Sequence, residues 1–317
     1  MTKLVSSHAL VQAKRHPFLQ ILQGSGRLRT MASTPPQALS TVPAASRVVA
    51  TNEKVTGPAG AEMLRRSGIT SSDGSSALQI LDNACGGGIL TSLILDEATK
   101  RPDDIKIKRI LAIDNDESIL AYVRKRSRDS DWKDVEIQHM DQTSLSLSDN
   151  SFDNIFSNFG IFFHPNDAAT LSETYRTLVP GGVAGLTSWK SISWWPSVAL
   201  PAFKTYLPDA PALPPNVTIF PAKGWTDTAS IPEKLEKAGF KDVQVSEYSF
   251  TPTVEAEEFA EATAVLAKVV MRRLWRSEDF SKFEGKVQEV LLRYLRENYA
   301  GGKWDGEMVA IITIGRK

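Results

Sequence analysis

The stretch Leu78-Gln79-Ile80-Leu81-Asp82-Asn83-Ala84-Cys85-Gly86-Gly87-Gly88 decides the fold of this chain. Its apolar first half is typical of a buried strand, its glycines mark a turn, and residues Ile89 to Ala98 continue as a helix. Glycine lets the backbone approach a ligand closely, and the first turn of a helix offers free N–H groups. A strand, a glycine turn and a helix in this order predict a nucleoside-binding site, with an ordinary strand-to-helix turn as the alternative.

Two later segments bring polar side chains to the same edge of the predicted sheet. The apolar run 110–113 leads into Asp114 and Asn115, and the run 135–140 leads into Asp141 and Gln142. A carboxylate at the end of the second strand accepts hydrogen bonds from both ribose hydroxyls. An amide or carboxylate on the next strand accepts from an adenine amino group. We therefore expect Gly86, Asp114 and Asp141 to converge on one adenosine.

A nicotinamide dinucleotide is the other ligand that such an edge holds. Its fingerprint needs glycines at positions 86, 88 and 91, and residue 91 is threonine. The spacing from the glycines to Asp114 also exceeds the roughly 20 residues of that fingerprint. These departures favour a ligand with one ribose.

The pattern resembles class I S-adenosylmethionine-dependent methyltransferases, whose opening motif appears as Asp82-x-Ala84-Cys85-Gly86-x-Gly88. Their later landmarks follow in order: a fourth strand at 150–158, a helix at 170–178 stopped by Val179-Pro180-Gly181-Gly182, and a fifth strand at 183–189. The resemblance implies S-adenosylmethionine as the cofactor. It also implies an α/β fold with a doubly wound seven-stranded sheet, in which the apolar run 308–314 is an antiparallel strand, and helical lid insertions.

A narrower resemblance extends over most of residues 46–317. Segments 52–57, 235–245, 293–299 and 309–315 are similar to fungal small-molecule methyltransferases of the gliotoxin thiomethyltransferase type. This implies methylation of a secondary metabolite, on a thiol. Methylation of oxygen or nitrogen is the alternative, and a catalytically silent cofactor-binding regulator is a distant one.

The resemblance also assigns cofactor contacts. The backbone of the glycine turn is expected to bind the aminocarboxypropyl arm, through Asn83, Ala84, Gly86 and Gly88. The ribose is assigned to the carboxylate of Asp114, and the adenine to Asn115, Asp141 and Gln142. The backbone carbonyl of Asn158 is expected near the amino group of the cofactor. Ala84 stands where glycine is usual, so we expect ordinary dihedrals there.

The acceptor side is predicted from the segment after the fourth strand. Phe159 and His164 lie there, and His164 is the best candidate for a catalytic base, against the alternative of a surface loop histidine. Trp189, Trp194 and Trp195 can form an aromatic wall or pack in the core. A thiol, with a free pKa near 8.5, needs less help from a base than a phenol near 10.

The amino-acid composition limits the classes of molecule that this chain is expected to bind. The 37 Lys and Arg residues balance 37 Asp and Glu residues, so no net field attracts nucleic acid or an anionic membrane, and a small-molecule substrate fits. The single cysteine, Cys85, excludes an intramolecular disulfide and a cysteine metal cluster, and no metal is expected. We find no run of transmembrane length, and the sequence sets no oligomeric state.

The chain is predicted to consist of a tail and one enlarged domain. The first fifty residues contain no Asp or Glu but six Lys and Arg residues, which is typical of either a mitochondrial transit peptide or a disordered tail. We expect a cytoplasmic protein with a tail at 1–45 and a methyltransferase domain at 46–317. Within that domain we predict a helical flap at 46–70, a proline-rich cap insertion at 190–225 and a second cap insertion of two helices at 255–300.

Overall fold

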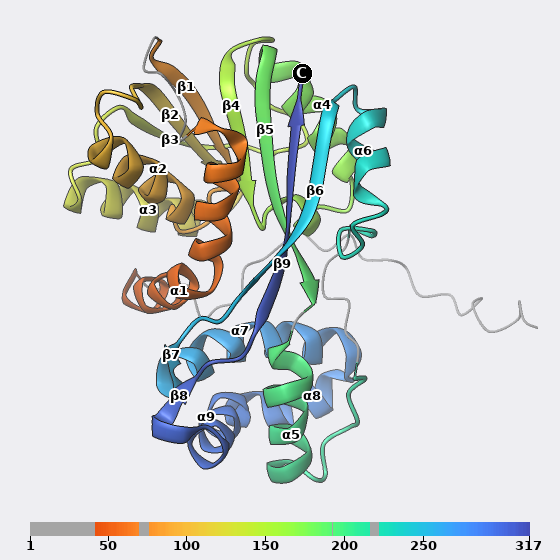
Figure 1. Cartoon of the computed structure of the whole chain (residues 1–317). Coiled ribbons are helices and arrows are strands. Elements are labelled where there is room, and N and C mark those ends of the chain that lie inside the picture. The colour runs from red at the N-terminus through yellow and green to blue at the C-terminus, as the bar shows by residue number, and fades with distance from the viewer. Residues whose placement is uncertain (1–41, 70–75, 192, 216–221) are drawn as a thin grey trace, which may run out of the picture. The chain divides into compact units, whose positions relative to one another are not determined.

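We describe the protein from a computed structural model, which describes residues 42–69, 76–191, 193–215 and 222–317. Of the tail predicted at 1–45, residues 1–41 lie outside these residues, and residues 42–45 belong to the first helix. The core is a seven-stranded sheet in the order β3-β2-β1-β4-β5-β9-β6 (Figure 1). Its strands are β1 (Leu78–Asn83), β2 (Ile107–Asp114), β3 (Val135–His139), β4 (Phe152–Asn158), β5 (Leu178–Ser191), β6 (Lys241–Phe250) and β9 (Met308–Arg316).

The strand directions match the predicted fold class. Strands β1 to β5 pair in parallel, and β9 pairs antiparallel with both β5 and β6. Alternate residues of each strand enter separate cores, since side chains point to opposite faces with a period of two. Ile80 packs with helices α1 (Val42–Ser67) and α2 (Ile89–Lys100), whereas its neighbour Leu81 joins the cluster on the other face. The doubly wound sheet is therefore confirmed.

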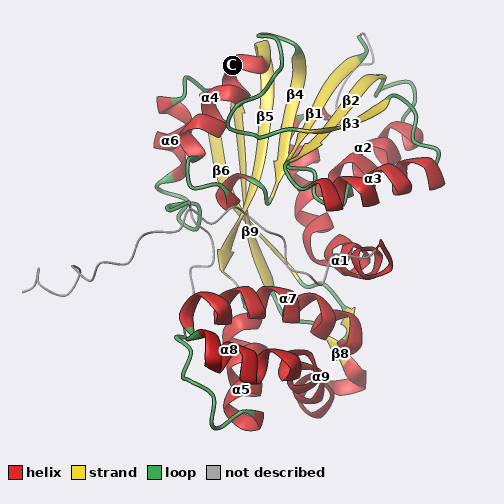
Figure 2. Ribbon diagram, turned by 180° about the vertical axis from the view of Figure 1, so that it is seen from behind, coloured by secondary structure: helices red, strands yellow, loops and turns green. Residues whose placement is uncertain are grey.

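Helices cover both faces of this sheet (Figure 2). Beside α1 and α2 lies α3 (Glu117–Asp129), and the opposite face carries α4 (Asp167–Thr177) and α6 (Ile231–Lys237). The flap predicted at 46–70 overlaps α1, which begins earlier, at Val42, and ends earlier, at Ser67. Met63 and Leu64 of α1 are buried against the sheet. This helix runs past the ends of β1 and β4, which places it beside the predicted cofactor edge.

The turn from α4 to β5 differs from the prediction. The helix ends at Thr177, and β5 begins at Leu178, so Pro180 and the two glycines lie inside the strand. Leu178 pairs with Phe152 and Val183 with Asn154, which makes the Pro-Gly-Gly segment a bulge. Gly182 fits this bulge because a Cβ there would lie 3.0 Å from the carbonyl oxygen of Asp153.

A helical cap lies where β4 and β5 end (Figure 1). It consists of α5 (Leu200–Tyr206), α7 (Ala256–Leu274), α8 (Ser277–Phe283) and α9 (Val287–Asn298), with the strand pair β7 (Val254–Glu255) and β8 (Lys303–Trp304). Short helical turns η3 (Ile161–Phe163), η4 (Trp195–Ala199), η5 (Glu284–Lys286) and η6 (Ala300–Gly302) complete the described elements.

Two details of the cap correct the prediction. The region 255–300 holds three α-helices and not two, because the chain leaves helical geometry at Trp275, which is extended at φ −97° and ψ 157°. The helical spacing of Leu266 and Val269 with Phe259 predicts a shared core stripe, but the two side chains are 36% and 44% exposed, since α7 buries the face that carries Phe259 and Ala267. Among the described residues, no helix combines the length and apolarity of a membrane span.

Candidate active site

The tips of β1 and β2 meet through hydrogen bonds. The Gly86 N–H donates to Asp114 Oδ2 at 2.9 Å, and the Cys85 N–H donates to the Ile113 carbonyl oxygen at 2.8 Å. The tip of β3 joins them, because the Met140 N–H donates to the Asp114 carbonyl oxygen at 3.0 Å. The structure therefore brings together the glycine turn, Asp114 and Met140, which directly precedes Asp141.

The glycine turn adopts left-handed geometry at three positions. Ala84, Gly86 and Gly88 have φ values of 60°, 50° and 74°. The prediction of ordinary dihedrals at Ala84 was wrong. A non-glycine residue in this region costs about 1 to 3 kcal/mol, and it persists only where surrounding contacts fix it. Here the bonds of the Cys85 and Gly86 N–H groups, directly after Ala84, tie the turn to β2.

The three consecutive glycines have different surroundings. A Cβ on Gly86 would meet nothing within 4 Å, whereas a Cβ on Gly87 would collide with Val49 and one on Gly88 would approach Trp132. Gly86 is thus the glycine with open space beside it, which is the geometry that a closely approaching ligand needs. Gly87 and Gly88 are glycines because protein packs against them.

Both carboxylate oxygens of Asp114 can accept further hydrogen bonds. Its Oδ2 accepts from the Gly86 N–H and its Oδ1 from the Asp116 N–H at 3.1 Å, which leaves one lone pair on each oxygen. Burial raises the pKa of the Asp114 carboxyl, partly offset by these backbone donors. Two remaining acceptor positions on one carboxylate match a pair of ribose hydroxyls.

Buried polar groups without partners lie at the same edge. Both side-chain atoms of Asn83 lack a hydrogen-bond partner among the described residues, although Asn83 is 1% exposed. Gln142 Oε1 is also buried and unpartnered there. Because buried polar groups are normally satisfied, these atoms indicate that the edge binds polar groups from outside the chain. The open side of Gly86 and the free positions on Asp114 agree with a nucleoside cofactor.

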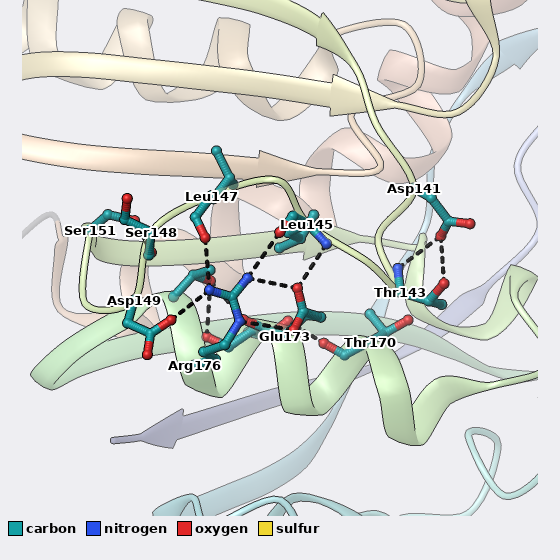
Figure 3. A network of polar contacts seen from close by, with 12 residues as sticks. Asp141, Thr143, Leu145, Leu147, Ser148, Asp149, Ser151, Thr170, Glu173 and Arg176 are labelled. Carbon is teal, nitrogen blue, oxygen red and sulfur yellow. Dashed lines mark hydrogen bonds and ion pairs between the residues drawn. The ribbon is translucent and has the colours of Figure 1, made fainter.

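The segment after Asp141 is fixed by one arginine (Figure 3). Arg176 on α4 donates to the carbonyl oxygens of Leu145 and Leu147, and it makes ion pairs with Glu173 and with Asp149. Glu173 in turn accepts from the Leu145 N–H at 2.7 Å. This network fixes residues 145–149 of the segment between β3 and β4 against α4.

Asp141 and Asn115 make local contacts. Asp141 Oδ1 accepts from both the N–H and the hydroxyl of Thr143 at 2.8 Å. Desolvation raises the pKa of Asp141, but the two hydrogen bonds from Thr143 outweigh it and lower the pKa overall. The Asn115 carbonyl oxygen lies 3.0 Å from His139 Nε2. The adenine contacts assigned to these residues stay a prediction.

On the acceptor side, Phe159 and Trp189 are neighbours. Phe159 follows β4 with a φ of 59°, and its ring stacks on Trp189 with a centroid separation of 4.0 Å. Trp194 and Trp195 are buried, meet each other edge to face, and Trp195 Nε1 donates to the Pro214 carbonyl oxygen at 3.0 Å. The ring contacts therefore place Trp189 beside Phe159 and place Trp195 against the proline-rich segment.

His164 has a hydrogen bond that bears on its chemistry. Its Nδ1 accepts from the Asn166 N–H at 3.0 Å. The neutral ring then carries its proton on Nε2, so neither nitrogen has a free lone pair for accepting a proton. The role of a base at this position stays a prediction, and it requires that bond to open. Across the described part of the chain, no three His, Cys, Asp or Glu side chains gather as metal ligands.

Sequence reasoning missed the residues by which α1 contacts the site. Arg126 on α3 donates to the Gly87 carbonyl oxygen at 3.0 Å and pairs with Glu53 on α1. Val49 on α1 packs on Gly87. Glu53 lies in the segment 52–57 that carries the narrower resemblance, but the sequence does not show with which basic side chain it pairs.

Comparisons with known proteins agree with this geometry. The family model for a methyltransferase domain matches residues 80–182. Acetylaranotin bis-thiomethyltransferase of Aspergillus terreus is 30% identical over 272 residues, which cover 84% of this chain and 91% of that protein. The methyltransferase tpcH of Aspergillus fumigatus is 28% identical over 261 residues, covering 80% and 90%. The methyltransferase ktnA of Aspergillus niger is 25% identical over 276 residues, covering 81% and 89%.

Proposed function

Because this chain belongs to the class I S-adenosylmethionine-dependent methyltransferases, we propose that it methylates a sulfur atom of a small-molecule fungal secondary metabolite. The membership confirms the resemblance drawn from the sequence, and S-adenosylmethionine is the cofactor. The observation that carries the choice of sulfur is the similarity to a bis-thiomethyltransferase over nearly the whole length of both proteins.

Each part of the cofactor edge has a proposed task. Asp114 holds the ribose hydroxyls with its two remaining acceptor positions, and the open backbone at Gly86 binds the aminocarboxypropyl arm together with Asn83 and Ala84. We assign the adenine to Gln142, whose buried Oε1 has no partner among the described residues, together with Asp141 and Asn115. When bound, S-adenosylmethionine supplies a methyl group on a positively charged sulfur.

The residues on the acceptor side favour a nucleophile that ionises without a base from the protein. A thiol with a pKa near 8.5 is a few per cent ionised at pH 7, so it needs little proton transfer to protein. The ring nitrogens of His164 are occupied by a proton and by the Asn166 bond. Phe159 and Trp189 present apolar rings that hold an acceptor in place and exclude water. Positioning then supplies most of the rate.

Three acceptor panels test the proposal directly. Purified enzyme is incubated with S-adenosylmethionine and with thiol, phenol and amine versions of one scaffold, and methylated products are identified by mass spectrometry. We expect turnover of the thiols. Turnover of the phenols or amines alone would assign oxygen or nitrogen instead, and the absence of turnover in all three would favour a regulatory protein.

A binding experiment tests the assigned cofactor edge. Titration calorimetry with S-adenosylhomocysteine should show binding to the wild type and loss of at least about tenfold in affinity for Asp114→Ala, because two charged-group hydrogen bonds are lost. Asp129→Ala, which removes an exposed carboxylate paired with Lys125 on α3, is the matched control and should bind as the wild type does. Equal binding by both variants would contradict the role given to Asp114.

A further inference from the structure

A directed chain of hydrogen bonds crosses three elements at the tip of β4. The Phe159 N–H donates to Thr187 Oγ1 at 2.8 Å, and the Thr187 hydroxyl donates to Asn158 Oδ1 at 2.8 Å. Asn158 Nδ2 then donates to the Thr56 carbonyl oxygen on α1 at 3.4 Å. A hydroxyl has one proton to donate, so the single donor of Thr187 is committed to Asn158 while its oxygen accepts from Phe159.

Thr187 fixes an unfavourable backbone conformation. Phe159, directly after β4, is left-handed at φ 59°, a conformation that a non-glycine residue keeps only where surrounding contacts fix it. Its N–H is buried and has Thr187 Oγ1 as its partner. Next along the chain, a Cβ on Gly160 would lie 2.6 Å from the Cβ of Ala84, so the segment already touches the glycine turn. The ring of Phe159 is therefore held against Trp189 by its own backbone.

The same chain of bonds reaches the flap helix at two points. The first is the Thr56 carbonyl oxygen, which accepts from Asn158 Nδ2. The second is Gly60, where an added Cβ would lie 3.2 Å from Asn158 Nδ2. The N-terminal half of α1 also contacts Gly87 of the cofactor turn and, through Glu53, Arg126. One helix thus touches both the cofactor turn and the side chain that Thr187 orients.

We propose that Thr187 is a positioning residue, whose hydroxyl sets the Phe159 ring against the acceptor and ties that ring, through Asn158, to the seated position of α1. The proposal rests on the proposed methyl transfer. Displacement of reacting groups by about 1 Å costs on the order of 100-fold in rate. A loosened Phe159 therefore lowers turnover more than it lowers cofactor affinity.

Thr187→Val is the central variant, since it replaces the hydroxyl by a methyl of similar size. We expect kcat to fall by about 10-fold to 100-fold while the Kd for S-adenosylhomocysteine changes by less than about threefold. Thr187→Ser keeps the hydroxyl and should recover most of kcat. Thr174→Val is the control, because Thr174 is equally buried and its hydroxyl donates within α4 to the Thr170 carbonyl oxygen. It should keep the wild-type kcat.

Asn158→Asp separates the two ends of the chain of bonds. The carboxylate still accepts from Thr187 but cannot donate to the Thr56 carbonyl oxygen. We expect this variant to raise the KM for S-adenosylmethionine by about 10-fold, because it loses the link to α1, and to alter kcat less than Thr187→Val does. A matching loss of kcat in both variants would contradict a division of labour along the chain.

The readouts distinguish failure of this inference from failure of the proposed function. All variants are assayed on whichever acceptor of the thiol, phenol and amine panels the wild type methylates, and amide exchange of residues 158–163 is followed in parallel with S-adenosylhomocysteine present. Faster exchange in Thr187→Val but not in Thr187→Ser is expected with any acceptor. Wild-type kcat and exchange in Thr187→Val, or equal losses in the Val and Ser variants, would overturn the role of Thr187. Absence of thiol turnover by the wild type would count against the proposed function alone.

Discussion

Val49 on α1 lies so close to Gly87 in the cofactor turn that a Cβ on Gly87 would come within 2.4 Å of Val49 Cγ2. Real Cβ atoms do not approach side chains this closely, so the glycine is required by the seated helix and not by a ligand. The contact makes the position of α1 depend on the shape of the turn. The covering of the cofactor turn by α1 therefore depends on one missing methyl group.

Gly87→Ala is expected to unseat the N-terminal half of α1. The φ of Gly87 lies outside the left-handed region, so alanine fits the backbone, and the three atoms nearest to the added Cβ all belong to Val49. We predict that affinity for S-adenosylhomocysteine falls by about 10-fold to 100-fold, because over-packing of this kind costs about 1 to 3 kcal/mol. Titration calorimetry measures the change.

Two further variants control this prediction. Val49→Ala in the Gly87→Ala background removes both methyl groups that cause the clash, so it should restore most of the affinity. Gly57→Ala places a methyl on α1 where nothing lies within 4 Å, and it should leave binding unchanged. A Gly87→Ala protein that binds as the wild type does would show that α1 is not held by this contact.

Arg126 is predicted to act on cofactor binding more than on stability. Arg126→Gln loses the bond to the Gly87 carbonyl oxygen and the ion pair with Glu53. A lost bond to a charged group is worth about 1.5 to 3 kcal/mol, so we expect the KM for S-adenosylmethionine to rise by about 10-fold or more. Arg124→Gln, which breaks an exposed pair with Glu117 on the same helix, should leave the KM unchanged. Equal KM values for the two variants would contradict the role of Arg126.

The strands of the sheet were predictable because burial leaves a direct mark on sequence. Residues 110–113 of β2 are apolar and buried, and the carboxylate of Asp114 follows them where the strand reaches the sheet edge. In the same way, an apolar run followed by glycines located β1 and the turn after it. These features depend on local patterns alone, so neighbouring residues were sufficient to find them.

Features that depend on tertiary contacts were not predictable in this way. The positive φ of Ala84 is imposed by bonds to β2, and the role of Thr187 arises only when β5 lies beside β4. The break between α7 and α8 did have a readable signal. Arg272 and Arg273 end α7 and acidic residues begin α8, as the helix dipole favours, but the apolar spacing across residues 255–300 masked it.

Asp82 is predicted to make stability fall as pH rises. Burial, opposed by two bonds from Thr91, raises the pKa of Asp82 from 3.8 to about 6 in the folded protein. Between pH 4 and pH 6 the unfolded chain loses this proton while the folded protein keeps it, so folding becomes less favourable by about 3 kcal/mol over that window and is constant above it.

Urea denaturation of the ligand-free protein measures this effect by comparison with Asp82→Asn. The amide oxygen can still accept from Thr91 but does not ionise, so the variant should lack the loss. Between pH 5 and pH 7 the wild type should lose about 1 kcal/mol more of its unfolding free energy than the variant does. Parallel pH profiles for the two proteins would show that Asp82 is ionised in the fold throughout.

Cys85 is predicted to be an unreactive thiol despite its place in the cofactor turn. Desolvation, reinforced by the charges of Asp82 and Asp114, raises the pKa of the Cys85 thiol well above its usual value, and the side chain is buried. Because the thiolate is the reactive form, native protein at pH 7 should react with a disulfide reagent at least about 100-fold more slowly than protein in urea.

S-adenosylhomocysteine should slow the labelling of Cys85 in the native protein further, since the bound ligand favours the conformation of the glycine turn in which Cys85 is buried. Addition of the ligand to Gly87→Ala should protect less than in the wild type. Rapid labelling of the native wild type would instead show that the turn at Ala84 and Gly86 opens readily without ligand.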